Sequence, residues 1–319
     1  MSLGEFDLIA KYFDRPARHA ALGIGDDCAL IQPSPGMQLA VSTDALVEGR
    51  HFLSTVAPER LGHKALAVNL SDLAACGAKP LAFTLALALP RVDEDFLAGL
   101  SRGMFALADA QGIELVGGDT TAGPLNLTLT VFGEVPAGQA LLRSGAKVGD
   151  DLYVSGVLGD ARLALEVFRG SLALDAAGFE QARRAMELPQ PRLALGQALR
   201  GIASSAIDLS DGLVGDIVHV LRRSGVGARI DVDALPRSAV LAAQPRELQL
   251  RCLLSGGDDY ELLFTAPPSH CEAVQAAAAS AGVGVTRIGT IDAVEGLRLV
   301  DAQGRPVAVQ CAAFDHFKS

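Results

Sequence analysis

The sequence predicts a mixed α/β (α+β) protein with two domains. Its 319 residues are about twice the ~150 that serve as a soft guide to one domain. Half of them are apolar and about a fifth are charged, which is a normal globular balance. Strand-like and helix-like segments are mixed in both halves, as in α/β and α+β folds. The absence of a fixed short repeat excludes solenoids and propellers.

Periodicity predicts a sheet with helices in the N-terminal half. Apolar residues at helical spacing indicate a short helix within residues 3–13, and stop signals at Gly77 and Pro80 end a helix that starts near Pro58. A third helix is expected from Asp93 to Gln111, ended by Gly112. Alternating or apolar runs predict strands at 28–32, 38–46, 81–90, 113–121 and 125–135. The "PAG" at 136–138 is the candidate boundary, which gives domains 1–137 and 138–319.

The C-terminal half also contains predicted strands and helices in alternation. "GDDLYVSG" is a strand bounded by glycines, and Ala-rich helical segments follow it up to about Gly201. In residues 204–225 we expect a strand, an N-cap at Ser210 and a helix ended by Gly225. "LLSGGDDYELLFTA" predicts a Gly-rich turn that feeds a strand, and a last helix ends at Gly282.

Composition narrows the class of partner. No apolar run approaches the ~20 residues of a membrane span, and the N-terminus lacks the basic region of an export signal. Five scattered cysteines without a CxxC pair predict reduced thiols in a cytoplasm and no zinc site. A net charge of −10 argues against nucleic acid. Small phosphorylated ligands stay possible, because metal ions can supply positive charge.

One pattern recurs along the chain: an Asp beside a small residue or glycine, next to a predicted strand. Glycine lets the backbone approach a ligand closely, and Asp offers a hard oxygen donor. One Mg²⁺ ion uses only one or two carboxylates. The large number of these motifs therefore suggests that several ions bind one phosphate-bearing substrate. The motifs are "GIGDDCAL", "STDALVEGRHF", "NLSDLAACGAKP", "VGGDTT", "IDLSDGL" and "SGGDDYEL".

Simpler interpretations remain open for single motifs. Asp and Gly are common turn residues, and Ser210 with Asp211 could merely cap a helix. An EF-hand is excluded because Gly212 falls one place early and the twelfth position is His219. Asp72 is harder to dismiss, since it lies in an apolar helix one turn after Asn69, where a lone buried Asp would be expensive.

The familiar phosphate-binding motifs are absent. No Gly-Lys dipeptide occurs, so there is no P-loop, and the HRD and DFG motifs of protein kinases are missing. No GxSxG motif is present, and "GIGDD" lacks the spacing of a dinucleotide fingerprint. These absences leave Asp-rich, metal-dependent phosphate chemistry.

The ordered motifs, with "LLRSGAKVGDDLYVSG" between the fourth and fifth, resemble the thiamine-monophosphate kinase family. That family belongs to the superfamily of aminoimidazole ribonucleotide synthetase and selenophosphate synthetase. The likeness runs from about Gly4 to "FDHF" at 314–317. It implies a two-domain aminoimidazole ribonucleotide synthetase-like fold whose N-terminal sheet pairs across a homodimer. It also implies ATP-dependent phosphorylation of thiamine monophosphate to thiamine diphosphate, with several Mg²⁺ ions.

The resemblance also implies three sets of site residues. Mg²⁺ would be held by Asp26, Asp27, Thr43, Asp44, Asp72, Asp119, Asp208 and Asp211. ATP would contact Gly118, Asp119, Arg143 and Ser210. The thiamine phosphate would face His51, Glu261 and Phe317. Adjacent pairs leave open which member of Asp26/Asp27 and of Asp258/Asp259 points inward. Arg143 and His51 could instead be surface residues, and Phe317 no more than a tail residue.

The chemistry agrees with these implications. The acceptor phosphate is already anionic, so it needs no strong general base, and Mg²⁺ can offset its repulsion from the ATP tail. Direct transfer without a phosphoenzyme is therefore the default hypothesis. Since the chain has no Trp, stacking on the thiamine rings would fall to Phe or Tyr.

Three rivals remain. A selenophosphate synthetase should carry a reactive Cys in a Gly-rich N-terminal segment, but no Cys precedes Cys28. Aminoimidazole ribonucleotide synthetase shares the implied fold, although "STDALVEGRHF" and "SGGDDYELLF" fit the thiamine enzyme better. A non-catalytic, cation-loaded scaffold is the third, and Mg²⁺-dependent ATP binding would exclude it.

Overall fold

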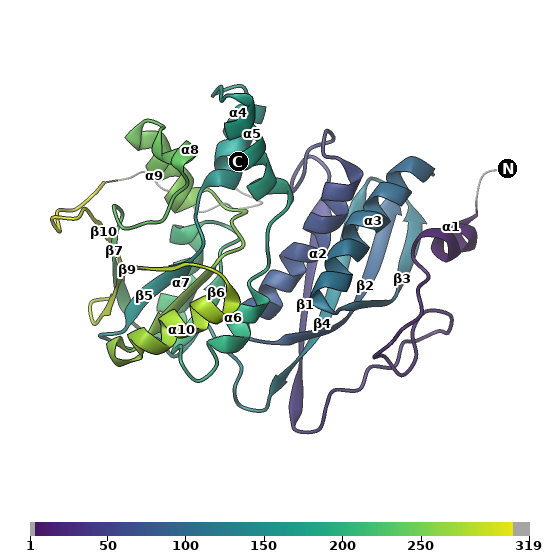
Figure 1. The fold of residues 1–319 in the computed structure, drawn as a ribbon, viewed down its shortest axis with the longest axis horizontal. Helices are drawn as coiled ribbons and strands as arrows, with labels where there is room; N and C mark the ends of the chain where they lie inside the picture. The colour runs from purple at the N-terminus through teal and green to yellow at the C-terminus, as the bar shows by residue number, and fades with distance from the viewer. Residues whose placement is uncertain (1–3, 309–319) are drawn as a thin grey trace. The chain divides into compact units, whose positions relative to one another are not determined.

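The computed structural model of the chain describes residues 4–308, and these form two compact units (Figure 1). Unit 1 contains the described residues up to Leu73 together with Ala78–Gly138. Unit 2 contains Ala74–Gly77 and the described residues from Gln139 onward. Among the described residues, no helix has both the length and the hydrophobicity to cross a membrane.

Unit 1 is a four-stranded sheet with two long helices and one short one. Its elements are α1 (Glu5–Tyr12), β1 (Met37–Val47), α2 (Pro58–Ala75), β2 (Lys79–Leu89), α3 (Glu94–Gln111), β3 (Glu114–Ala122) and β4 (Asn126–Pro136). All three helices agree with the sequence prediction. Asp93 caps α3 by accepting a hydrogen bond from the Phe96 N–H, and Gly112 ends it with φ 65°, the left-handed conformation that glycine adopts without penalty.

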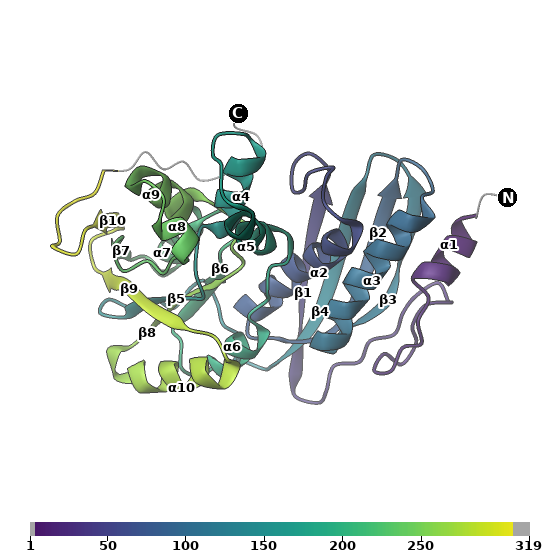
Figure 2. The same ribbon diagram turned by 45° about the horizontal axis from the view of Figure 1, so that its top comes forward.

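The sheet of unit 1 has the strand order β1-β4-β2-β3. The pairs β1/β4 and β4/β2 are antiparallel, whereas β2 and β3 are parallel. The carboxyl ends of β1, β2 and β3 therefore lie at one edge of the sheet. Both ribbon views place α2 and α3 on the same face (Figures 1 and 2).

The other face of this sheet is open in the single chain. On β1, alternate residues are exposed, including Leu39 at 44% and Val41 at 55%. In the row next to Val41, Val131 on β4 is fully buried on the face that the helices cover. Alternation of this kind marks a sheet with one covered face.

One predicted strand is wrong. Residues 28–32 form no strand, and only an isolated bridge joins Leu30 to Leu22. The segment has no neighbouring strand to pair with, Leu30 is 56% exposed, and Pro33 ends it. A short apolar run is a weak signal without a partner. The predicted strands at 38–46, 81–90, 113–121 and 125–135 agree with β1, β2, β3 and β4.

Unit 2 contains a six-stranded sheet of order β10-β7-β9-β5-β8-β6. Its strands are β5 (Asp151–Ser155), β6 (Ser205–Asp208), β7 (Gly227–Asp231), β8 (Leu262–Ala266), β9 (Val285–Asp292) and β10 (Gly296–Val300). Its helices are α4 (Asp160–Phe168), α5 (Ala176–Glu187), α6 (Leu193–Ala198), α7 (Leu213–Ser224), α8 (Ala239–Ala242), α9 (Arg246–Ser255) and α10 (Cys271–Ala281), with a 3₁₀ turn at Pro268–His270.

Both faces of the unit 2 sheet are covered. Leu152 and Val154 on β5 join the large core that the neighbouring helices share. Tyr153, between them, points the other way and stacks on Phe264 of β8 at 5.3 Å. Because successive side chains of a strand alternate between faces, β5 is buried at every position. This explains the uninterrupted run of Leu152, Tyr153 and Val154 in the sequence.

The predicted N-cap at Ser210 is also wrong. Helix α7 begins at Leu213, and its N-cap residue is Gly212. Asp216 Oδ2 accepts a hydrogen bond from the Asp211 N–H at 3.1 Å, which ties the loop before α7 to the first turns of the helix. The predicted end at Gly225 is confirmed, with φ 65°.

Candidate functional site

In unit 1, side chains of α2 meet the edge of β1. Asp72 Oδ2 accepts a hydrogen bond from Ser42 Oγ at 2.5 Å, and Asn69 Oδ1 accepts one from the Asp44 N–H at 3.0 Å. Asn69 is fully buried, and its Nδ2 donates to the carbonyl of Ala65 at 2.9 Å. Asp72 thus faces β1, and its carboxylate lies beside the Ser42 hydroxyl in the middle of that strand.

Asp119 lies on β3, after a glycine that the backbone requires. Gly118 has φ 154°, and a Cβ there would lie 1.9 Å from the carbonyl oxygen of Leu85. Only glycine fits such a close approach. Gly118 and Asp119 are both exposed. The Gly-Asp pair is therefore placed at the surface by strand pairing and is not a simple turn.

The sheet register separates two of the predicted metal ligands. Asp44 on β1 shares a row with Leu129, Leu85 and Gly118, so Asp119 belongs to the next row. Side chains in successive rows point to opposite faces, and β1 and β3 are the two edges of the sheet. Within one chain of unit 1, Asp44 therefore lies on the face of β1 that Asp72 contacts through Ser42, whereas Asp119 belongs to a row that points to the opposite face.

The remaining predicted residues of unit 1 lie in a loop and on β1. Asp26 and Asp27 are both exposed in the loop before β1, so the structure does not choose between them. Thr43 faces the open side of the sheet, and its Oγ1 is 2.9 Å from Oγ1 of Thr130. His51 Nδ1 accepts a hydrogen bond from the Val47 N–H at 3.0 Å. In the neutral ring, this contact leaves the proton on Nε2.

In unit 2, two Asp-rich loops pack against each other. The Leu209 N–H donates to the carbonyl of Glu261 at 2.9 Å, and the Tyr260 N–H donates back to the carbonyl of Leu209 at 2.8 Å. The Asp258 N–H donates to the carbonyl of Ser210 at 2.8 Å. A Cβ on Gly257 would lie 2.8 Å from that same oxygen. The loops that contain the motifs "IDLSDGL" and "SGGDDYEL" are therefore joined by backbone hydrogen bonds into one packed unit.

The loop after β6 concentrates negative charge. Asp208 is 5% exposed, and Asp211 is half-buried beside Asp216. Burial, with the charge of Asp211 added to it, raises the pKa of Asp216 to about 7, although backbone donors and the charge of Arg143 oppose the shift. Arg143 therefore lies within electrostatic reach of this loop, where a phosphate would be attracted to it.

Asp258 and Asp259 have different environments within unit 2. Asp259 Oδ1 accepts a hydrogen bond from the Gly159 N–H at 2.8 Å, and its Oδ2 is buried without a hydrogen-bond partner in the described structure. Burial raises the pKa of Asp259 well above its usual range. Asp258 instead accepts from the Tyr260 hydroxyl at 3.1 Å. Both Asp258 (φ 61°) and Tyr260 (φ 49°) occupy the left-handed region, a strain that often marks functional loops.

Glu261 is held by partners that sequence reasoning missed. It is 5% exposed and forms a two-point ion pair with Arg192, in which Nε donates to Oε2 at 2.6 Å and Nη2 to Oε1. Ser155 Oγ donates to the same carboxylate at 2.5 Å. A Cβ on Gly156 would lie 2.0 Å from Glu261 Oε1. No local signal marks Arg192, because it lies 69 residues away in sequence.

The donors fit Mg²⁺ better than a transition metal. In residues 4–308, no group of three or more His, Cys, Asp or Glu side chains is close enough to hold a metal ion. Mg²⁺ does not need one, since one or two carboxylates, waters and substrate phosphates complete its shell. Asp72 and Asp44 with Ser42 offer only oxygen donors. Phe317, predicted to face the substrate, lies outside the described residues.

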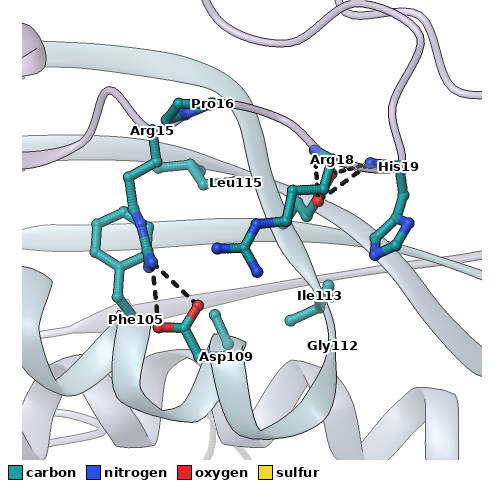
Figure 3. A pocket seen from close by; sticks show the side chains of 11 residues that line it. Arg15, Pro16, Arg18, His19, Phe105, Asp109, Gly112, Ile113 and Leu115 are labelled. Carbon is teal, nitrogen blue, oxygen red and sulfur yellow. Dashed lines mark hydrogen bonds and ion pairs between the residues drawn. The ribbon is translucent and has the colours of Figure 1, made fainter.

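A separate cavity in unit 1, of about 460 Å³, contains none of the predicted site residues. Figure 3 shows Arg15 above the Phe105 ring and paired with Asp109. The guanidinium lies 4.5 Å from the ring centroid and 3.1 Å from an Asp109 oxygen. Glu114 accepts backbone N–H groups of the same segment, that of Arg18 at 2.7 Å. These contacts fasten the N-terminal segment to α3 and β3.

Comparison with known proteins agrees with this two-unit structure. The family model for AIR synthase related protein, N-terminal domain, matches residues 25–135, and the model for the C-terminal domain matches residues 147–302. Together they cover most of the chain. The chain therefore belongs to the AIR synthase related family.

Individual relatives narrow the family further. Thiamine-monophosphate kinase of Salmonella typhimurium is 50% identical over 325 residues, which cover 99% of each chain. The crystal structure of thiamine-monophosphate kinase from Stenotrophomonas maltophilia is 44% identical, with a TM-score of 0.85 over 94% of this chain and 95% of that one. AaThiL in complex with AMPPCP and TMP is 28% identical, with a TM-score of 0.79 over 90% and 89%. Within the AIR synthase related family, the chain belongs to the thiamine-monophosphate kinases.

Proposed function

We infer that this chain transfers the γ-phosphate of ATP to thiamine monophosphate, giving thiamine diphosphate and ADP. The observation that carries this inference is identity of about half over essentially the whole length of a thiamine-monophosphate kinase. The AaThiL structure holds AMPPCP and TMP together, which favours direct transfer between two bound substrates. A cation-loaded scaffold would not explain either finding.

We propose that several Mg²⁺ ions bind to the protein as its cofactors. Bound Mg²⁺ would neutralise the phosphates and align donor with acceptor. Asp72 and Asp44 are the first candidates in unit 1, because α2 packs on the face of β1 that carries Ser42 and Asp44 and holds Asp72 against Ser42 there. Asp208 and Asp211 are the candidates in unit 2, in the loop before Asp216, the carboxyl group whose pKa the charge of Arg143 lowers. Asp26, Asp27, Thr43 and Asp119 remain predicted Mg²⁺ ligands, of which Thr43 and Asp119 belong to the open face of the sheet.

The remaining residues have roles in binding. Arg143, Gly118 and Ser210 are proposed to contact ATP, and His51 to donate its Nε2–H toward the substrate phosphate. Glu261 is proposed to act on the substrate through Arg192, since its carboxylate is already occupied by that guanidinium and by Ser155. Phe317 remains a predicted substrate contact.

We further propose that the protein works as a homodimer in the cytoplasm, with domains 1–137 and 138–319. The open face of the unit 1 sheet supports the dimer, because exposed Leu39 and Val41 would be covered by a second copy. Cys28, Cys76, Cys252 and Cys271 are free thiols, which supports a reducing compartment.

The test is turnover with both substrates. Purified protein with ATP, Mg²⁺ and thiamine monophosphate should release ADP and form thiamine diphosphate, identified by chromatography. Asp72→Asn should lower kcat and raise the Mg²⁺ concentration needed for half-maximal rate, whereas Asp14→Asn, an exposed acid in the same unit, should change neither. Absence of thiamine diphosphate with the wild-type protein would refute the proposed function.

A further inference from the structure

Asp26 and Asp27, two of the predicted Mg²⁺ ligands, lie in the connection between α1 and β1. Residues 22–30 close into a loop in this connection, which we call the acidic loop. At its base the Leu30 N–H donates to the carbonyl of Leu22 at 2.9 Å. Both aspartates are exposed. Because an exposed loop with few contacts of its own opens easily, the direction of its carboxylates depends on what holds the base.

The carboxylate of Glu114 holds the backbone just before the acidic loop. Glu114 is the first residue of β3, and its Oε1 accepts the Arg18 N–H at 2.7 Å. Its Oε2 accepts the His19 N–H at 3.0 Å and the Ala20 N–H at 3.3 Å. The dashed lines beside Arg18 and His19 in Figure 3 belong to this set of contacts. One side chain thus binds three consecutive peptide groups, and we call this arrangement the Glu114 clamp.

The Glu114 clamp is ionic at neutral pH. Burial opposes the charge of Glu114, but the backbone donors of residues 18–20 together outweigh it and hold the pKa of this carboxyl group below its usual range. Hydrogen bonds to a charged acceptor are about twice as strong as those between neutral groups. The clamp therefore restrains the backbone more firmly than ordinary loop hydrogen bonds would.

Two contacts connect the clamp to the acidic loop. Ala21 follows the clamped residues directly, and its N–H donates to the carbonyl of Leu30, at the other end of the loop, at 2.9 Å. Gly23 packs on Ala17 so closely that a Cβ on Gly23 would lie 2.9 Å from the Ala17 Cβ. The loop is thus fixed to the residues on both sides of the clamp, and a displacement of residues 18–20 would move it.

The clamp begins on a rigid element. Glu114 pairs with Ala82 of β2 at the start of the parallel β2/β3 ladder, and the neighbouring Leu115 is 5% exposed. The same strand carries Asp119, another predicted ligand. Groups supported by strands are placed more precisely than groups supported by loops. Glu114 therefore fixes the base of an exposed loop to the sheet of unit 1.

We propose that Glu114 is a positioning residue for Mg²⁺, because it holds the acidic loop in the arrangement in which Asp26 or Asp27 binds the ion. This step rests on the proposed function and on the predicted role of these two aspartates. Glu114 acts through the backbone of residues 18–20, so its role requires no contact with the ion or a substrate. Without the clamp, a smaller fraction of molecules holds the loop correctly, and the apparent affinity for the ion falls with that fraction.

The first measurement is the Mg²⁺ concentration that gives half the maximal rate at saturating ATP and thiamine monophosphate. Glu114→Ala should raise this concentration about five- to twentyfold, with kcat at saturating Mg²⁺ within about twofold of the wild type. Glu114→Gln keeps one oxygen acceptor and should give an intermediate value. The second measurement is amide hydrogen exchange without Mg²⁺, in which peptides covering residues 18–30 should exchange about tenfold faster in Glu114→Ala.

Glu94→Ala is the matched control in the same unit. Glu94 is an exposed carboxylate that pairs with Lys11 and accepts from the Tyr12 hydroxyl at 3.0 Å. It therefore fastens α1, which precedes the clamp, and not the base of the acidic loop. Glu94→Ala should keep the wild-type Mg²⁺ requirement and the wild-type exchange of residues 18–30. An equal rise of the Mg²⁺ requirement in Glu94→Ala and Glu114→Ala would overturn a specific role of Glu114.

The outcomes separate this proposal from the proposed function. If the wild type forms thiamine diphosphate and both Glu114 variants keep its Mg²⁺ requirement, the positioning role is wrong and the proposed function stands. If Glu114→Ala loses folded structure, Glu114→Gln decides alone.

A wild type that forms no thiamine diphosphate would refute the proposed function. In that case, the Mg²⁺ concentration that half-protects residues 21–30 from exchange replaces the rate as the measurement. A higher concentration for Glu114→Ala than for the wild type would support the positioning role. Equal concentrations, or no protection of the wild type, would overturn it as well.

Discussion

Arg192 and Glu261 form a two-point ion pair inside unit 2, with Arg192 Nε 2.6 Å from Glu261 Oε2. The side chain of Glu261 is 6% exposed and that of Arg192 is 24% exposed. Such a pair is costly to break, because removal of one partner leaves a buried charge without compensation. The carboxylate also accepts from Ser155 Oγ, so the three side chains form one polar network.

Arg192→Met should therefore lower the free energy of unfolding by about 3–5 kcal/mol. The double variant Arg192→Met/Glu261→Leu should be less destabilised than Arg192→Met alone, because it removes both charges. Urea unfolding of the wild type, both single variants and the double variant gives the coupling directly. Additive effects of the two single substitutions would mean that the pair contributes no specific stability.

Gly118→Ala should damage unit 1 far more than Gly117→Ala. A Cβ on Gly118 would lie 1.9 Å from the Leu85 oxygen, whereas a Cβ on Gly117 would meet nothing closer than 3.9 Å. We expect a loss of about 3 kcal/mol or more for Gly118→Ala and about 1 kcal/mol or less for Gly117→Ala. Thermal unfolding of both variants measures this. Equal stability of the two would show that β3 shifts to accommodate the new methyl group.

Sequence patterns predicted most elements of both units, because those elements obey local rules. Asp93 and Gly112 are local cap signals for α3, and both have the expected roles. The predictions of a strand at 28–32 and of a cap at Ser210 were wrong because residues elsewhere in the chain decide them. Residues 28–32 lack a partner strand, and Ser210 is held in a loop by the Asp258 N–H, so that α7 begins only after Gly212.

The sequence predicts a site residue where a charged side chain lies in an otherwise apolar segment. A lone carboxylate in an apolar helix is expensive to bury, so the sequence predicts that Asp72 has a specific partner, and Asp72 does contact Ser42 on β1. Arg192 and Glu261 are 69 residues apart in sequence, and no pattern in either segment predicts their contact. Tertiary packing likewise joins the loops around Ser210 and Asp258. The opposite orientation of Asp44 and Asp119 follows from sheet register, which the sequence does not specify.

Asp259 should make stability fall as pH rises. Burial raises its folded-state pKa, so the folded protein keeps a proton that the unfolded chain releases. Below the unfolded-state pKa, near 3.9, this group has no effect on stability. Between that value and the folded-state pKa, each pH unit costs about 1.4 kcal/mol.

Asp259→Asn tests this dependence. Asn keeps an oxygen for the Gly159 N–H and carries no charge to bury. The variant should match the wild type near pH 4 and unfold at a higher temperature as pH rises to 8. Glu295→Gln removes an exposed acid and should follow the wild type throughout. A constant difference between Asp259→Asn and the wild type across this range would contradict a buried, proton-retaining carboxyl group.

Val41→Lys should convert the proposed dimer to a monomer. Val41 is 55% exposed on the open face of the unit 1 sheet, and a dimer that covers this face would have to bury the new ammonium group at high cost. Light scattering coupled to gel filtration at micromolar concentration should give the mass of a dimer for the wild type and of one chain for Val41→Lys. Val294→Lys, at a residue that is 69% exposed in unit 2, adds the same charge away from the face and should remain dimeric. A dimeric Val41→Lys variant would place the interface elsewhere, and a monomeric wild type would exclude the dimer itself.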